Sequence, residues 1–179
     1  MKSLCVFCGA NPGNHPRYLK VARELGALLA RENITLVYGG GRVGLMGALA
    51  DAALADGGRV VGVIPQLLLD KEVGHSGLTE LHVVDTMARR KQVMGDLSDA
   101  FLTLPGGIGT MDELFEAWTW TQLELHRKPC GLLNQEGYYD PLIAFIDRCI
   151  EEGFLRPRHG AALLVDTDLE SLVRKLREH

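Results

Sequence analysis

The sequence lacks the features that mark membrane, secreted and nucleic-acid-binding proteins. None of its apolar runs approaches the roughly 18 to 20 residues of a membrane-spanning helix. The first residues, MKSLCVFCGAN, show neither the apolar core nor the cleavage site of a signal peptide. The 19 Lys and Arg residues are outnumbered by 23 Asp and Glu residues, so bulk charge does not favour nucleic acid. We therefore expect a cytoplasmic protein that binds neither membranes nor nucleic acid.

Cysteine and histidine are too scattered to suggest a disulfide framework. The four cysteines lie at positions 5, 8, 130 and 149 without regular spacing, which is typical of a reducing compartment. Cys5 and Cys8 could form a redox pair or half of a zinc site, but no second pair of ligands has suitable spacing. Because both cysteines fall in the apolar segment 4–8, we interpret them as small core residues of a buried strand and predict no metal.

Strand-like and helix-like segments alternate along the chain without a linker or a repeat. Short apolar runs predict strands at 4–8, 34–38, 59–64, 81–85, 99–104, 129–133 and 161–165. Helical spacing predicts helices at 17–32, 86–94, 110–125, 137–152 and 168–177, and a further helix of small residues that follows the turn at 39–47 and ends at residue 55. The pattern predicts an α/β fold, a Rossmann-like doubly wound parallel sheet with helices on both faces, as a single domain over residues 1–179. Ligands of such sheets bind at the carboxyl ends of the strands.

The segment PGGIGTMDELFE at 105–116 connects a predicted strand to a predicted helix through a glycine-rich turn. Glycines allow the backbone to approach a ligand closely, and the free N–H groups of a helix N-terminus favour anions. Thr110 is suited to cap that helix, because Glu113 follows three residues later. We predict that residues of this turn bind a phosphate: Gly106, Gly107, Ile108, Gly109 and Thr110.

A plain strand-to-helix turn is the alternative explanation of this segment, with glycines chosen only for turn geometry and glutamates only for solubility. Three glycines within residues 106–109 are more than such a turn requires. The turn also lacks the Lys-Ser/Thr that follows the last glycine in a nucleoside-triphosphate P-loop, so an ATPase is not predicted.

The helix after this turn carries two carboxylates on one face. Glu113 and Glu116 are three residues apart, whereas Leu114, Trp118 and Leu125 are predicted to face the core. For Trp118 a place in a subunit interface is an alternative to the core. A carboxylate is therefore expected about one helical turn from the phosphate site.

A second glycine-rich turn, GGGRVGLMG at 39–47, follows the predicted strand 34–38. Its glycines match the GxGxxG spacing of dinucleotide-binding proteins, but the next strand ends in Pro65-Gln66 where that motif needs an acidic residue. We interpret the turn as a second backbone contact of a mononucleotide site, through Gly40 and Gly41. Packing of helix on strand is an alternative role that is compatible with the first.

Three consecutive cations, Arg89, Arg90 and Lys91, lie in the first turns of a predicted helix. Cations are unfavourable there because of the helix dipole, so we expect them to meet an anion. Consecutive helical residues point in different directions, so at least one of the three should be solvated.

Four motifs occur together: VFCGA at 6–10, VYGGGRVGLMG at 37–47, MARRK at 87–91 and PGGIGTMDE at 105–113. In combination they resemble the Lonely Guy family, once mislabelled as lysine decarboxylases, and the resemblance continues through GLLNQEGYYDPL over nearly the whole chain. It implies a cytosolic, homodimeric phosphoribohydrolase that needs no cofactor. The implied substrates are AMP and N6-prenylated (cytokinin) adenosine 5′-monophosphates, cleaved at the N-glycosidic bond to free base and ribose 5-phosphate.

The resemblance also implies roles for individual residues. Glu113 would stabilise an oxocarbenium-like sugar and orient the attacking water, and Arg90 would balance charge on the leaving base or bridge to Glu113. Besides the glycine turn, the resemblance implies substrate contacts at Glu72, Lys91 and Thr119. Independently of the resemblance, we predict further contacts at Gly9, Gly40, Gly41 and Glu116. Ala10 and Ala88 depart from the family pattern, which often has serine and histidine there, and Asn11 could replace the missing hydroxyl.

A decarboxylase and a non-catalytic carrier are two alternatives to the phosphoribohydrolase. A pyridoxal phosphate decarboxylase would need a lysine placed for a Schiff base, and no motif marks one. A non-catalytic carrier or sensor of a nucleotide derivative could use the same fold. Such a carrier would not need Glu113 together with Arg90, and release of adenine from AMP discriminates between the two classes.

Overall fold

A single parallel sheet forms the centre of the computed structural model, which describes residues 1–70 and 74–179. Its strands are β1 (Ser3–Phe7), β2 (Thr35–Tyr38), β3 (Val60–Pro65), β4 (Glu80–Val84), β5 (Ala100–Thr103), β6 (Cys130–Leu133) and β7 (Leu163–Asp166). The strand order is β4-β3-β2-β1-β5-β6-β7, and every pair of neighbours is parallel. The predicted fold class is confirmed.

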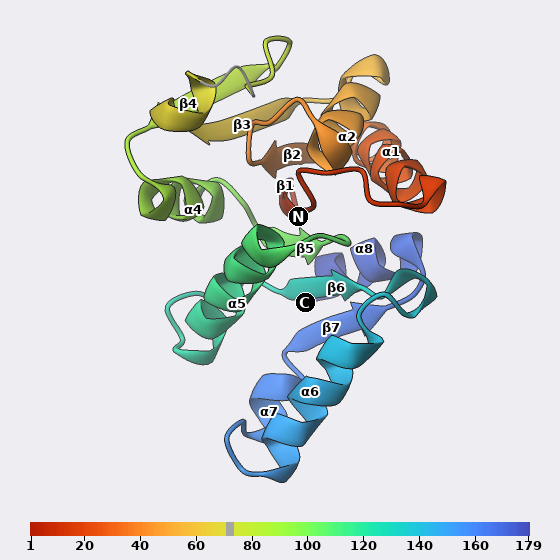
Figure 1. Ribbon diagram of the computed structural model, residues 1–179, viewed down its shortest axis with the longest axis vertical. Helices are drawn as coiled ribbons and strands as arrows, with labels where there is room; N and C mark the ends of the chain where they lie inside the picture. Colours follow the sequence, from red (N-terminus) through yellow and green to blue (C-terminus); the bar gives the residue numbers. More distant parts are fainter. Residues whose placement is uncertain (71–73) are drawn as a thin grey trace.

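Helices cover both faces of the sheet (Figure 1). They are α1 (Pro16–Arg31), α2 (Gly44–Ala55), α3 (Gln66–Leu69), α4 (Met87–Asp96), α5 (Ile108–Gln122), α6 (Asp140–Glu151), α7 (Pro157–Gly160), α8 (Leu169–Glu178) and the 3₁₀ helix η1 (Gln135–Gly137). Side chains of α1, α2 and α8 share one hydrophobic core cluster with the sheet, and side chains of α4, α5 and α6 share the other. None of the helices in the described ranges is long and apolar enough to cross a membrane.

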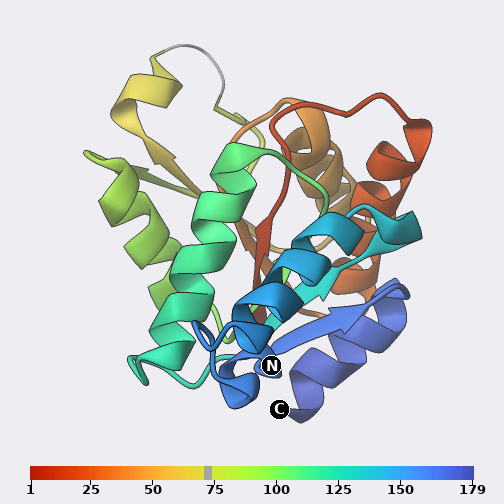
Figure 2. The ribbon, with the colours of Figure 1, turned by 60° about the horizontal axis from the view of Figure 1, so that its bottom comes forward.

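The direction of winding reverses at the centre of the sheet, between β1 and β5. From β1 the chain passes through α1 to β2, and from β5 it passes through α5 on the opposite face to β6. The loops that leave β1 and β5 touch where the amide of Gly9 donates to the carbonyl of Pro105, and beyond that contact they diverge and leave a crevice at the carboxyl ends of these strands. Figure 2 shows α5 and α6 on the near face of the sheet, with β1 visible between them.

The start of α5 differs from the prediction. The helix begins at Ile108, two residues before the expected start, and Gly107 precedes it in an extended conformation without a side-chain cap. Thr110 is consequently a buried residue of the first turn and does not cap the helix. The helix also ends at Gln122, so Leu125 lies beyond it and is 68% exposed instead of facing the core.

Other local predictions were wrong near the C-terminal half of the sheet. The helix predicted from residue 137 begins only at Asp140, because Glu136 and Gly137 have positive φ and interrupt it. The helical spacing that predicted this helix put Phe145 on its inner face together with Ile146, but Phe145 is 61% exposed and only Ile146 of the two is buried. The short helices α3 and α7 were not predicted, since four residues are too few to show a helical period.

Candidate active site

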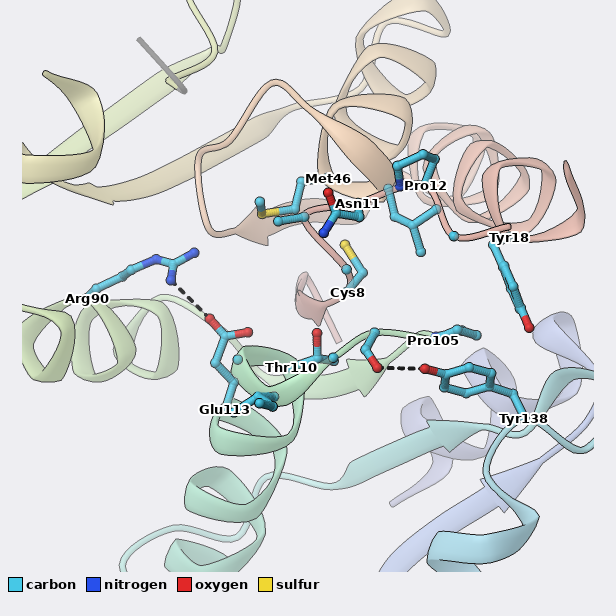
Figure 3. A pocket seen from close by; sticks show the side chains of 18 residues that line it. Cys8, Asn11, Pro12, Tyr18, Met46, Arg90, Pro105, Thr110, Glu113 and Tyr138 are labelled. Atoms are coloured by element: carbon cyan, nitrogen blue, oxygen red, sulfur yellow. Dashed lines mark hydrogen bonds and ion pairs between the residues drawn. The ribbon is translucent and has the colours of Figure 1, made fainter. Parts of the chain in front are cut away.

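A pocket of about 470 Å³ opens in the crevice between β1 and β5 (Figure 3). Its walls come from the loop after β1, the first turns of α1, α2 and α5, one residue of α4, and the turn before α6. They consist of Cys8, Gly9, Ala10, Asn11, Pro12, Gly13, Tyr18, Leu45, Met46, Arg90, Pro105, Gly106, Gly107, Ile108, Gly109, Thr110, Glu113 and Tyr138. The predicted ligand-binding edge of the sheet thus contains a pocket in which the loop of residues 105–110 (here the glycine loop) forms one wall.

The backbone N–H groups of residues 107–110 are free to bind a ligand. Within the described part of the chain, no hydrogen-bond acceptor takes any of them, and the first amide of this segment that donates is that of Met111, to the carbonyl of Gly107 at 3.1 Å. These N–H groups stand at the N-terminus of α5, where the helix dipole adds partial positive charge. The glycine loop therefore presents a preformed anion site.

Two of the loop glycines are not explained by packing within the protein. A Cβ on Gly107 or Gly109 would meet nothing within 4 Å, whereas a Cβ on Gly106 would lie 2.1 Å from Oγ1 of Thr110 and 2.9 Å from the nitrogen of Gly9. Gly106 is thus required by the close approach of two loops. Open space at Gly107 and Gly109 agrees with a ligand reaching the backbone and is not accounted for by the plain-turn alternative.

Glu113 and Arg90 form a buried ion pair at one end of the pocket. Oε1 of Glu113 lies 3.3 Å from Nη1 of Arg90, and the two residues are 8% and 7% exposed. Burial raises the pKa of Glu113 to about 7, although the charge of Arg90 acts in the opposite direction. Near neutral pH this carboxyl can therefore exist in either protonation state.

The guanidinium of Arg90 is fixed by the ends of two strands. Its Nε donates to the carbonyl of Val63 at 3.1 Å and its Nη2 to the carbonyl of Gly39 at 3.2 Å. A Cβ on Gly39 would lie 1.7 Å from Nη2, so a glycine is needed at this position to make room for the arginine. The glycine-rich turn after β2 thus contributes to the site by holding Arg90.

The other cations of α4 meet carboxylates or solvent, as expected. Lys91 pairs with Asp112, at 3.0 Å between Nζ and Oδ2, and with Glu116. Burial acts to lower the pKa of Lys91, but its bonds to Glu116 and Asp112 outweigh that effect and raise the pKa. Arg89 is exposed and binds the side chain of Gln92. Of the three cations, the structure brings only Arg90 into the pocket.

The structure separates the predicted site residues into two groups. Gly9, residues 106–110, Glu113 and Arg90 line the pocket. The described pocket wall does not include Gly40, Gly41, Lys91, Glu116 or Thr119. Glu72 lies outside the described residues. As substrate contacts, the members of this second group stay predictions.

The residues outside the pocket have other surroundings. Gly40 and Gly41 are buried beside the segment after residue 73, where the carbonyl of Gly40 accepts from the amide of His75 at 2.9 Å. Thr119 is exposed further along α5. Trp118 is buried and its Nε1 donates to the carbonyl of His159 at 2.9 Å, so it belongs to the core.

Several pocket residues were not predicted from the sequence, notably Tyr18, Met46 and Tyr138. Tyr138 belongs to the GYYD segment after β6, and its position beside the glycine loop follows from the pairing of β6 with β5. Cys8 was expected in the first strand, but β1 ends at Phe7 and the buried Cys8 lines the pocket. Burial raises the pKa of its thiol well above the usual range. Among the described residues, no three His, Cys, Asp or Glu side chains gather as metal ligands.

The fold and the pocket define a class: doubly wound α/β proteins with an anion site on a glycine loop next to a buried acid–arginine pair. The chain belongs to the family described as "Possible lysine decarboxylase", whose model matches residues 46–176. This is the family predicted from the sequence motifs.

Relatives with assigned names cover nearly the whole chain. A cytokinin riboside 5′-monophosphate phosphoribohydrolase of Rhodococcoides fascians is 50% identical over 177 residues, which are 98% of this chain and 89% of that protein. A protein of the same name from Arabidopsis thaliana is 46% identical over 178 residues, 99% of this chain and 84% of that protein.

Solved structures of more distant proteins share the fold. A molybdenum cofactor binding protein from Rippkaea orientalis superposes with a TM-score of 0.75 at 21% identity, covering 99% of this chain and 97% of that one. The molybdenum cofactor carrier protein of Chlamydomonas reinhardtii gives 0.73 at 20% identity, covering 99% and 98%. At this level of identity the similarity concerns the fold alone.

Proposed function

We propose that the protein is a phosphoribohydrolase, a hydrolase that acts on the N-glycosyl bond of AMP and of N6-substituted adenosine 5′-monophosphates. Its products are the free base and ribose 5-phosphate. The observation that carries this proposal is the Glu113–Arg90 pair, which faces the same pocket as the free amides of the glycine loop. The names of relatives at 46% and 50% identity support it independently.

The geometry suggests a division of labour between the two parts of the pocket. The N–H groups of residues 107–110 bind the 5′-phosphate, which places the ribose next to Glu113, less than two helical turns along α5. Water attacks C1′ while the C1′–N bond breaks, its electron pair goes to the base, and the base takes up a proton. Positive charge develops on the sugar during this step, and the carboxylate of Glu113 stabilises it and orients the water.

Arg90 supports this chemistry in two ways. Its positive charge helps to keep Glu113 ionised despite burial, and its position beside the carboxylate lets it balance negative charge on the leaving base. The carbonyls of Val63 and Gly39 hold the guanidinium, so little reorganisation is needed during the reaction.

A lysine decarboxylase activity is not supported by the pocket. None of its described wall residues is a lysine, whereas a pyridoxal phosphate enzyme needs one for the Schiff base. A carrier on this fold would bind its ligand without the buried pair of Glu113 and Arg90, which costs desolvation energy and has no role in binding alone.

Incubation of the purified protein with AMP, followed by chromatography of the products, tests the proposal. We expect adenine and ribose 5-phosphate, and we expect Glu113→Gln to slow adenine release by about 10²-fold or more because it removes the charge that stabilises the sugar. Asp112→Asn is a matched control, since the adjacent carboxylate points away from the pocket and pairs with Lys91. Binding of AMP without any base release would favour the carrier.

We further propose that the protein acts as a homodimer in the cytoplasm. Large apolar side chains are exposed on α4, on α5 and just after α5, and burial between two copies would remove them from water. They are Met87, Ile108, Phe115, Leu123 and Leu125. Light scattering that gives twice the mass of one chain would support the dimer.

A further inference from the structure

Three successive carbonyl groups before α5 each accept a hydrogen bond. The hydroxyl of Tyr139 donates to the carbonyl of Leu104 at 2.8 Å, the amide of Gly9 to that of Pro105 at 3.1 Å, and the hydroxyl of Tyr138 to that of Gly106 at 2.8 Å. The next amides along the chain, those of residues 107–110, have no acceptor among the described residues. The protein thus holds the carbonyl oxygens of this segment and leaves its N–H groups free.

The orientation of one peptide group is decisive for an anion site in this loop. In a trans peptide the C=O and N–H bonds point in opposite directions, so a Gly106 carbonyl held toward Tyr138 directs the N–H of Gly107 away from Tyr138. In Figure 3 the hydroxyl of Tyr138 lies on the opposite side of the loop from Glu113. The N–H of Gly107 is therefore directed to the side of the loop away from Tyr138.

Without such a bond this peptide group would be free to rotate. Gly106 and Gly107 lie on either side of it, and glycine accepts both orientations at little cost. Rotation would bring a carbonyl oxygen, which repels anions, into the position of the N–H donor. The peptide groups at Leu104 and Pro105 need less restraint. Leu104 is fully buried next to β5, and the ring of Pro105 fixes its φ angle.

The position of Tyr138 is set by its neighbours and not by burial. Its ring packs edge-on against Tyr18 and Tyr139, with centroids 5.6 Å and 4.8 Å apart. The side-chain oxygen of Asn134 accepts from the amide of Tyr139 at 2.8 Å, which anchors the turn that carries both tyrosines. Tyr138 itself is 39% exposed, so the core does not require its side chain.

We propose that Tyr138 is a positioning residue of the anion site: its hydroxyl fixes the Gly106–Gly107 peptide group in the orientation that binds phosphate. The proposal rests on the proposed phosphoribohydrolase function. It assigns to the hydroxyl an effect on binding of the phosphate group and none on the chemistry at Glu113.

Tyr138→Phe tests the proposal, because it removes one oxygen atom and keeps the ring contacts. We expect the KM for AMP and the Kd for ribose 5-phosphate to rise by about three- to tenfold, the effect of losing one hydrogen bond, while kcat changes less than about twofold. Arg17→Gln is the matched control, since it breaks the ion pair with Glu136 in the same turn and leaves the hydroxyl in place. The control should keep the wild-type KM and Kd.

The outcomes separate this inference from the proposed function. Equal Kd and KM in wild type and Tyr138→Phe would overturn the inference alone, and so would a fall in kcat with unchanged KM. Equal changes in Arg17→Gln would also overturn it, since the anchoring of the turn would then matter and the hydroxyl would not. Wild-type protein that neither binds ribose 5-phosphate nor cleaves AMP would overturn the proposed function itself.

Discussion

At the scale of single residues, the site depends on a carboxyl group kept out of water. Glu113 has one cationic partner in contact and is otherwise enclosed, so its pKa is raised to about 7 by burial. A carboxylate with little solvent around it stabilises a developing positive charge more strongly than an exposed one. The same burial makes the activity sensitive to pH near neutrality.

The pH dependence follows from the direction of this shift. Because the reaction needs ionised Glu113, kcat/KM for AMP should fall as the pH drops below about 7, approaching tenfold per pH unit, and should be level above it. Steady-state rates between pH 5 and pH 9 measure this profile.

Asp112→Asn provides a control for ionisation of the substrate phosphate. The neighbouring Asp112 contributes to the raised pKa of Glu113, so its removal should move the midpoint to lower pH. If the midpoint reflected the phosphate of AMP, it would not move. A profile that is flat from pH 5 to pH 8 would contradict the role of Glu113.

At the scale of elements, the glycine loop combines Gly106, where packing requires a glycine, with Gly107 and Gly109, where packing within the protein does not. Gly106→Ala places a Cβ against Thr110 and the backbone of Gly9, so we expect the free energy of unfolding to fall by about 1–3 kcal/mol. Gly109→Ala, in the first turn of α5, meets no atom within 4 Å and should not lower the unfolding free energy by more than about 0.5 kcal/mol. Urea unfolding measures both, and equal destabilisation by the two substitutions would contradict the described loop.

Most elements of the sheet could be predicted from the sequence because buried parallel strands have continuous apolar runs bounded by glycine, proline or polar residues. The strand predicted at 99–104 is β5 at Ala100–Thr103, for example. The start of α5 was placed too late because Thr110 and Glu113 have the spacing of a capping box. The actual N-cap, Gly107, has no side chain that could signal it.

Of the residues that line the pocket, the sequence motifs predicted Gly9, Arg90, Glu113 and the glycine loop. Glu113 and the glycine loop belong to one motif and lie together in the pocket. Gly40 and Gly41 do not line the pocket. The GxGxxG spacing shows where glycines occur but not which contact each of them makes, and the glycine at position 39 is needed to make room for Arg90. Tyr138 was missed because it is 32 residues from Gly106, and only the pairing of β5 with β6 brings them together.

At the scale of the whole molecule, the pocket is a consequence of topology. The winding reverses between β1 and β5, so the loops after these strands diverge beyond the contact of Gly9 with Pro105. The glycine loop, α5 and the residues just after β1 line the crevice between them. The distant molybdenum cofactor proteins share this architecture. In this chain the crevice also contains the buried pair of Glu113 and Arg90, on which the proposed function depends.

The central claim is that the free amides of the glycine loop hold a phosphate so that Glu113 meets the sugar. Comparison of kcat/KM for AMP and for adenosine tests it most directly, since the two substrates differ only in the phosphate. We predict a value for AMP at least about 10²-fold higher, because adenosine forgoes several charge-assisted hydrogen bonds to the loop. Equal values for the two substrates would contradict the account.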